Sequence, residues 1–463
     1  MPVDQEEENT ESQQERSRKR RKRKAKSDQR DDPMDAWFWS NASTSSLESH
    51  FQQMLCTIWQ RTYGLTALCP MPFIPTQQRC SSTGSLQQPY LRDSFRITEE
   101  NLNSVKSEVG QMDPEEWRSL TNYTDLASLL RYDVKNNQDL ELGTNAWLKF
   151  WNILHEYPEL TKSDGTATFS SLHLCEAPGA FVSALNHFLS CKLPEIHKSW
   201  KWLASSLSPY DTVVNKEAIV EDTLIRCTKH NWHFGADDSG DILRRANRSA
   251  LVEAAKTALG DVWLVTADGG LDCSEHPADQ EETLAALKLA EAVTALRILT
   301  KGGNFVLKIF TTFLWKTCVL LRILCGCFLK VNLYKPPTSK SGNSETYVVC
   351  LDFCGDCNSV DSINYLLDLE ASDLPSEYMH SIVGDEFVQE LDTVSQLFAQ
   401  FQSEAIRTNL AVYSTSGNRR QRTCFHRAKQ QFSQQFLLRA PVPPLSKENK
   451  LLTVEDASVE DTV

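Results

Sequence analysis

Long apolar runs are missing from the sequence, and their absence limits the classes of protein it can encode. The most apolar window, Trp315 to Leu329, is interrupted by Lys316 and Arg322 and is too short to span a bilayer comfortably. The N-terminal residues, Met1-Pro-Val-Asp-Gln5 and three glutamates, lack the apolar segment of a secretory signal. We therefore expect no membrane span and no signal peptide.

Regularly spaced cysteine pairs are missing as well. The 14 cysteines are scattered irregularly through 463 residues, often inside apolar runs, which is typical of reduced thiols in an intracellular protein. Cys354 and Cys357 have the spacing of half a zinc site, but no second pair lies at a matching distance. We expect no bound metal ion.

An excess of positive charge is also missing. The formal net charge of −13 argues against a protein that coats nucleic acid with a generally basic surface. Positive charge is concentrated instead between Arg16 and Lys26, where nine of eleven residues are basic. Such a run is disordered and indicates a nuclear import signal, an RNA-contacting arm or both, with a merely solvated tail as the alternative. We expect the protein in the nucleus and the cytoplasm.

What the sequence does contain is a long alternation of strands and helices between residues 141 and 354. Short apolar runs predict strands, and longer stretches with helical periodicity lie between them. The pattern predicts an α/β fold, with a doubly wound, mostly parallel sheet and helices on both faces. The expected strands are Ser171–Cys175, Trp200–Leu207, Val262–Thr266, Phe305–Phe310, Lys330–Tyr334 and Thr346–Phe353, and the expected helices are Gly179–Ser190, Ile242–Leu259, Gln280–Leu299 and Phe313–Cys325.

The regions on either side of this alternation differ from it in composition. We expect a disordered tail over residues 1–40, a helical N-terminal extension over 41–140, a helical C-terminal extension over 355–440 and a flexible tail over 441–463. The N-terminal extension includes a helix over Leu47–Tyr63. A further helix, about Gly143 to Tyr157, carries Lys149 almost opposite its apolar face, so periodicity alone predicts a solvated lysine.

The segment Leu172-His-Leu-Cys-Glu-Ala-Pro-Gly-Ala-Phe181 is the first candidate for a site. Its apolar run ends in a Pro-Gly turn that opens a helix, an arrangement that can present backbone N–H groups to a small ligand. Gly179 leaves room for a ligand to approach the backbone closely. An ordinary junction between a strand and a helix is the alternative.

Polar residues at strand ends are the second signal, because ligands of open α/β sheets bind at the carboxyl ends of the strands. Glu176 and Asp268 follow strands, and Lys308 lies near the end of one, between apolar neighbours. Such a lysine reaches the rim of the sheet or is buried and paired; a lysine extending into solvent is the alternative. Beside other charges its pKa can be lowered enough for general base catalysis.

Four residues together resemble a known family. Lys149 in Asn145-Ala-Trp-Leu-Lys-Phe150, Asp268 in Thr266-Ala-Asp-Gly269, Lys308, and Glu345 in Gly342-Asn-Ser-Glu-Thr-Tyr347 match the Lys-Asp-Lys-Glu tetrad of the FtsJ/RrmJ-like ribose 2′-O-methyltransferases, in the same order. The resemblance covers about residues 95–353. It implies a Rossmann-like methyltransferase fold and S-adenosylmethionine as cofactor. It also implies that Lys308 is the general base, Asp268 orients it near the sulfonium, and Lys149 and Glu345 hold the nucleotide.

The cofactor loop narrows the resemblance. The family usually has Gly-Pro-Gly-Gly there, whereas Ala177-Pro-Gly-Ala180 is similar to the branch that methylates capped mRNA on the second transcribed nucleotide. Capped mRNA is then the expected partner. That branch continues into a second, degenerate methyltransferase-like domain. This chain ends too early to contain a whole one, and we expect it to be a shortened form. Activity on the first cap nucleotide or another RNA, and a non-catalytic RNA- or cofactor-binding scaffold, stay open, as does the oligomeric state.

The resemblance also assigns ligand contacts. Cofactor-binding residues are expected at Gly179, Trp200, Asp241 and Asp268, although Trp200 could simply be core and Asp241 could cap a helix that begins at Ile242. The second strand lacks the acidic residue that binds the cofactor ribose in many relatives. Phosphate contacts are expected from Lys335 and Lys340, and from either Arg297 or Lys301.

Overall fold

The computed structural model describes residues 38–66, 90–110, 112–137, 140–163, 168–210, 222–271, 273, 278–355, 383–415 and 419–452. The basic run Arg16–Lys26, nearly all of the expected N-terminal tail, Cys357 and the last eleven residues of the expected C-terminal tail lie outside these ranges.

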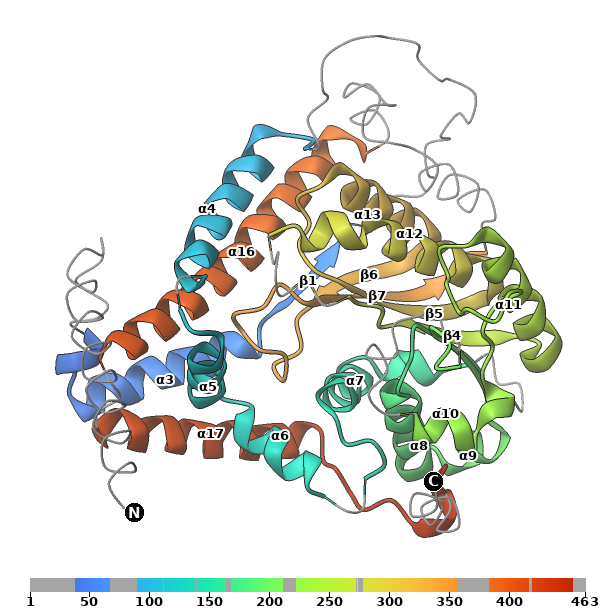
Figure 1. Cartoon of the computed structure of the whole chain (residues 1–463), viewed down its shortest axis with the longest axis horizontal. Coiled ribbons are helices and arrows are strands. Elements are labelled where there is room, and N and C mark those ends of the chain that lie inside the picture. Colours follow the sequence, from blue (N-terminus) through green and yellow to red (C-terminus); the bar gives the residue numbers. More distant parts are fainter. Residues whose placement is uncertain are drawn as a thin grey trace, which may run out of the picture.

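A seven-stranded sheet in the order β1-β6-β7-β5-β4-β2-β3 forms the centre (Figure 1). β2 pairs in parallel with β3 and β4, and β4 with β5, whereas β7 is antiparallel to both β5 and β6, and β1 is antiparallel to β6. Only β1 and β7 therefore oppose the common direction, which confirms the mostly parallel sheet. The strands are β1 Thr62–Leu65, β2 Ser170–Leu174, β3 Lys201–Ser205, β4 Val262–Ala267, β5 Leu299–Ile309, β6 Phe328–Tyr334 and β7 Thr346–Phe353.

Helices cover both faces of this sheet, as the alternation predicts (Figure 1). Successive strand residues point to opposite faces, so Val265 packs in one apolar cluster with α11, α12 and α13, and Leu264 in another with α7 and α8. β2 and β4 are buried at every position because both of their faces are covered. The helices of this domain are α7 Asn145–Glu156, α8 Ala180–Lys192, α9 Pro194–Ser199, α10 Thr223–Cys227, α11 Arg245–Leu259, α12 Gln280–Ile298 and α13 Trp315–Cys327.

The terminal segments form a helical frame along one side of the sheet (Figure 1). α4 packs on α16, and α17 packs on both α3 and α6. Residues 441–452, expected to be flexible, instead lie against α8, where the Asn186 side-chain amide donates to Asn449 O at 2.7 Å. The helices of the frame are α3 Thr44–Ile58, α4 Asp93–Val109, α5 Pro114–Thr124, α6 Ser128–Lys135, α16 Asp385–Ser414 and α17 Arg419–Arg439.

Three predicted boundaries were wrong. The helix expected over Leu47–Tyr63 ends at Ile58, and Thr62–Leu65 forms the edge strand β1 because its backbone pairs with β6. The helix expected from Ile242 begins at Arg245. The strand expected from Phe305 begins at Leu299, so that Gly302 and Gly303 lie inside β5, where the pairing with β4 is irregular and a Cβ at Gly303 would lie 2.8 Å from Thr300 O.

Among the described helices, none combines the length and the apolar character needed to cross a membrane. The described residues also contain no group of three or more His, Cys, Asp and Glu side chains able to hold a metal ion.

Candidate active site

Two ion pairs lie side by side at the carboxyl edge of the sheet. Lys308, near the end of β5, places Nζ 3.2 Å from Oδ1 of Asp268, which follows β4. Lys149 on α7 places Nζ 2.7 Å from Glu345 Oε1, immediately before β7. The β5–β7 pairing sets Lys308 opposite Tyr347, two residues beyond Glu345, which brings the two pairs together. All four residues of the tetrad therefore meet in one place.

The environment of Lys149 differs from its prediction. Its side chain is only 15% exposed, because Glu345, 196 residues further along the chain, covers the side of α7 opposite the apolar face. Helical periodicity reports which face packs on the core, and it contains no information about a partner brought in by another strand.

The electrostatics of Lys308 also differ from the expectation. Burial lowers its pKa, but the carboxylates of Asp268, Glu345 and Glu291 outweigh burial and raise the pKa above the ordinary lysine value. Conversely, burial would raise the pKa of Glu345, but Lys149, Lys308 and Lys335 lower it to about 2. The protein alone thus holds a charged tetrad with Lys308 protonated at neutral pH.

Two further residues orient the tetrad, and neither was singled out from the sequence. The buried Tyr347 donates its hydroxyl to Asp268 Oδ1 at 3.0 Å, and Ser339 donates to Glu345 Oε1 at 3.0 Å. Alternation along β7 places Tyr347 on the same face as Glu345, and this period-two pattern was the available signal. No local pattern marks Ser339, which lies in the loop between β6 and β7.

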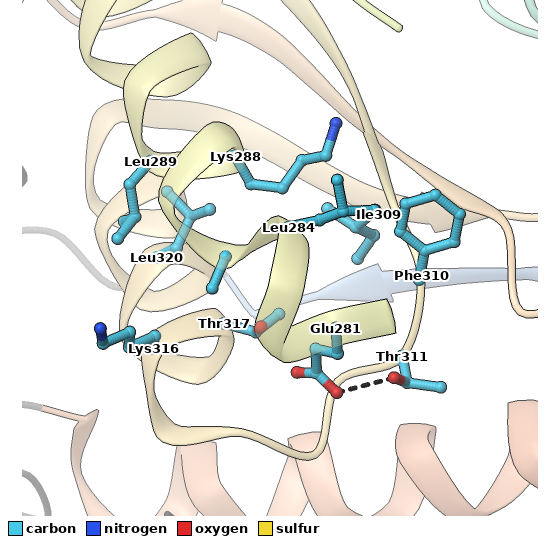
Figure 2. A pocket seen from close by; sticks show the side chains of 11 residues that line it. Glu281, Leu284, Lys288, Leu289, Ile309, Phe310, Thr311, Lys316, Thr317 and Leu320 are labelled. Carbon is cyan, nitrogen blue, oxygen red and sulfur yellow. Dashed lines mark hydrogen bonds between the residues drawn. The ribbon is translucent and has the colours of Figure 1, made fainter. Parts of the chain in front are cut away.

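The loop after β4 is held by a buried ion pair on α12. Lys288 Nζ lies 2.8 Å from Glu291 Oε2, with side chains only 7% and 0% exposed. Glu291 accepts from Gly269 N at 2.9 Å, and Lys288 donates to Gly269 O at 2.7 Å. Earlier on α12, Glu281 accepts from Thr311 Oγ1 at 2.7 Å and holds the chain after β5 (Figure 2). α12 therefore fixes the segments that carry Asp268 and Lys308.

Comparisons with known proteins agree with this geometry. The FtsJ-like methyltransferase family matches residues 143–353, which contain the whole tetrad. The chain carries an FtsJ-like methyltransferase domain. Methyltransferases of this kind generally take their methyl group from S-adenosylmethionine.

Three curated relatives share the name cap-specific mRNA (nucleoside-2′-O-)-methyltransferase 2. The protein of Danio rerio is 38% identical over 69% of this chain and 44% of its own length. The protein of Mus musculus is 34% identical over 82% of this chain and 49% of its own length. The protein of Drosophila melanogaster is 36% identical over 71% of this chain and 47% of its own length. The chain thus spans about half the length of these relatives.

The shape of the turn before α8 fits the cofactor of an FtsJ-like domain, although its backbone N–H groups are already occupied. Gly179 has φ +111°, and a Cβ there would lie 2.3 Å from Leu224 Cδ2, so only glycine is accommodated. A Cβ at Gly270 would come within 3.3 Å of Lys308 Nζ. Beside these glycines the carboxylate of Asp268 is 18% exposed, which suits a ligand with a positive centre.

The backbone N–H groups at the start of α8 already have an acceptor. Glu176 accepts from Phe181 N at 2.7 Å and from Val182 N at 3.0 Å. Burial raises the pKa of Glu176 to about 8. The expectation that these N–H groups face a ligand therefore requires Glu176 to move, and the turn contributes mainly its shape.

Trp200 and Asp241 do not join the tetrad. Trp200 precedes β3, at the opposite end of that strand, where its indole N–H donates to Ser171 Oγ at 2.9 Å and its ring stacks on Trp202. These contacts favour the alternative that Trp200 is a core residue and not a cofactor contact. Asp241 accepts from Leu243 N at 2.9 Å and pairs with Arg244 at 3.3 Å, so it caps a turn rather than the start of α11.

The expected phosphate contacts also need correction. Lys335 is 3% exposed, and its ammonium group donates to Asn343 O, Asn343 Oδ1 and Glu345 O, so it supports the tetrad instead of facing RNA. Burial lowers its pKa to about 7. Arg297 lies in the last turn of α12 and Lys301 near the start of β5, at the edge of the sheet opposite the tetrad. Only Lys340, next to Ser339, lies near the site.

Proposed function

We propose that this chain transfers the methyl group of S-adenosylmethionine to the ribose 2′-hydroxyl of the second transcribed nucleotide of capped mRNA. The observation that carries the proposal is the meeting of the pairs Lys308–Asp268 and Lys149–Glu345 at the carboxyl edge of the sheet. The names of the curated relatives supply the choice of nucleotide.

The residues divide the work of the reaction. Lys308 accepts the proton of the 2′-hydroxyl, and Asp268, itself held by Tyr347, fixes the position of Lys308. Lys149 and Glu345 hold the ribose so that its oxygen is aligned for in-line attack. Asp268 would hold the cofactor, which would supply the methyl group, and the positive charge of its sulfonium would oppose the carboxylates that raise the pKa of Lys308.

Cofactor contacts are proposed for Gly179, Asp268 and Gly270. The turn at Gly179, a position that favours glycine, and the partly exposed carboxylate of Asp268 support this choice. We do not extend it to Trp200, whose indole is engaged at the other end of β3. Nuclear and cytoplasmic localisation is proposed from the basic run Arg16–Lys26 alone.

The test is transfer of labelled methyl to a capped RNA that is already methylated on its first nucleotide. The product is digested to locate the label. We expect label on the second nucleotide with the wild-type chain and a loss of at least about a hundredfold in rate with Lys308→Ala, because general base catalysis contributes at least that much. Lys308→Arg should be equally impaired, since a guanidinium cannot accept the proton. Lys256→Ala, an exposed lysine on α11, serves as the control.

Other outcomes separate the alternatives. Label on the first nucleotide would replace the proposed substrate position while keeping the chemistry. Substantial transfer by Lys308→Arg would contradict the role of Lys308 as base. Binding of S-adenosylmethionine without any transfer would favour a non-catalytic scaffold.

A further inference from the structure

Basic side chains from three helices outside the segment that matches the FtsJ-like family lie beside the tetrad, together with Lys340 from inside that segment. Arg118 on α5 and Arg131 on α6 lie near Lys340 in the loop between β6 and β7, and Lys429 on α17 lies near Arg131. We call these four residues the basic cluster. In a chain with a net charge of −13, four cations brought together from four elements need an explanation.

Direct contacts join the basic cluster to the tetrad. Arg131 Nη1 donates to Thr338 O at 2.8 Å. The next residue, Ser339, donates to Glu345 Oε1 at 3.0 Å, and Lys340 follows it in the chain. One short loop therefore contacts the tetrad through Ser339 and the basic cluster through Thr338, so the two places adjoin.

The two lysines of the basic cluster have no ion-pair partner among the described residues. Arg131 pairs with Asp125, but neither Lys340 nor Lys429 forms an ion pair with a described carboxylate. Burial and the neighbouring Arg131 lower the pKa of Lys429 to about 8, and burial with Arg131 and Arg118 lowers the pKa of Lys340. The cations repel one another, and a bound anion would relieve that repulsion.

Two polar groups at the same place also have no hydrogen-bond partner among the described residues. Thr338 Oγ1 is one, in a side chain only 1% exposed, and the Tyr123 hydroxyl is the other. The Tyr123 ring lies 5.5 Å from Lys429 Nζ. Both hydroxyls can donate to the oxygens of an anion.

We propose that the basic cluster binds backbone phosphates of the RNA whose ribose is held by Lys149 and Glu345. The inference rests on the proposed function for the choice of RNA as the chain that spans both places. It assigns a substrate-binding role to the terminal helices α5, α6 and α17, which flank the methyltransferase domain in sequence. Phosphate contacts position a nucleic acid without reading its bases, so the cluster determines where the RNA lies, not which RNA is bound.

The test uses the full chain with Arg118→Gln, Lys340→Gln and Lys429→Gln combined. Arg131 is left intact, because its pairing with Asp125 is buried and its loss could unfold the protein. Fluorescence anisotropy with a labelled capped RNA, and with the same RNA uncapped, is measured at several salt concentrations. A matched control removes three exposed lysines outside the cluster, Lys198, Lys201 and Lys256, each replaced by Gln. Calorimetry with S-adenosylmethionine verifies the fold of both variants.

We expect the cluster variant to bind both RNAs at least about tenfold more weakly and to lower the slope of log Kd against log salt by about 2, since each single-strand phosphate contact contributes about 0.7. The control variant should retain most of the affinity, and cofactor binding should be unchanged in both. Equal losses of RNA affinity in the two variants would mean that only the net charge of the chain matters. A loss confined to capped RNA would mean that the cluster binds the cap. Either result overturns the inference.

The two proposals fail separately. If the wild-type chain methylates the second nucleotide and the cluster variant binds RNA as tightly as wild type, the inference is wrong and the proposed function stands. If RNA binding depends on the basic cluster but no label reaches the second nucleotide, the inference stands and the proposed function is wrong.

Discussion

The state of Lys308 is the central question raised by the site. A general base must be unprotonated, yet the carboxylates around Lys308 raise its pKa above the ordinary lysine value in the protein alone. In the tetrad Lys308 is therefore protonated, and the neutral amine is a minor form at neutral pH. This arrangement keeps a buried lysine paired before substrates arrive, and it makes the reaction dependent on pH.

We expect kcat/KM for methyl transfer to rise about tenfold per pH unit across the neutral range, because only the unprotonated form of Lys308 accepts the proton. The sign follows from a raised pKa: the active form grows as pH increases towards that pKa. kcat should level off at lower pH than kcat/KM, since the sulfonium of the bound cofactor lowers the pKa of Lys308 in the complex. Initial rates over pH 6–9 test this, and a flat profile for both constants would contradict it.

Single residues show where prediction from the sequence succeeds and where it fails. Lys149, Asp268, Lys308 and Glu345 could be selected because their order along the chain is a family pattern, and the structure brings them together. Lys335 was misjudged because lysines usually face solvent, whereas three oxygens on its own loop bind its ammonium group. Such partners are set by tertiary contacts that no local pattern reveals.

The strands and helices themselves were largely predictable from hydrophobic periodicity. The alternation from Ser170 to Phe353 was recovered because its strands contain short apolar runs, such as residues 262–265 in β4 and residues 347–351 in β7, that lie between covered faces. Errors arose where pairing overrides local preference. Thr62–Leu65 becomes a strand through its pairing with β6. Inside β5, Gly302 has a φ of +86° and a Cβ at Gly303 would lie 2.8 Å from Thr300 O, so both positions favour glycine.

Helix α12 provides a test of how an element fixes the site. Lys288→Met should destabilise the chain by about 3–5 kcal/mol, because it leaves the fully buried carboxylate of Glu291 unpaired. Adding Glu291→Leu should recover most of that loss, since the unpaired charge is removed. The double variant should still transfer methyl slowly, because Gly269, next to Asp268, loses both of its bonds to α12.

Urea unfolding and methyl-transfer rates measure the two effects separately. The matched control is Lys256→Met on α11, which breaks an exposed pair of the same spacing with Glu253 and should change stability by less than about 1 kcal/mol. A double variant as unstable as Lys288→Met alone would mean that packing, and not the unpaired charge, dominates this region.

The chain as a unit depends on contacts between its two ends, which sequence reading treated as separate extensions. Residues 38–66 supply β1 and α3, and α3 packs on α17 from the other end of the chain. The link continues to the site: Lys335 N donates to Arg61 O at 2.9 Å, and Lys335 in turn contacts Glu345. Such long-range packing joins segments with unrelated local patterns, so periodicity found the helices but not their partners.

This connection predicts that damage to the helical frame spreads to the site. Phe425 on α17 is 1% exposed and lies between Trp39, Phe51 and Tyr123, with ring centroids at 5.8, 4.6 and 4.9 Å. Phe425→Ala should therefore destabilise the chain by about 3–5 kcal/mol. Thermal unfolding should remain a single transition, with tryptophan fluorescence and loss of methyl transfer shifting together. Leu438→Ala, on the same helix at a side chain 85% exposed, should leave the midpoint nearly unchanged. If Phe425→Ala instead produced two transitions, and only the one unrelated to activity moved, the frame would be an independent unit and its coupling to the tetrad through β1 would be wrong.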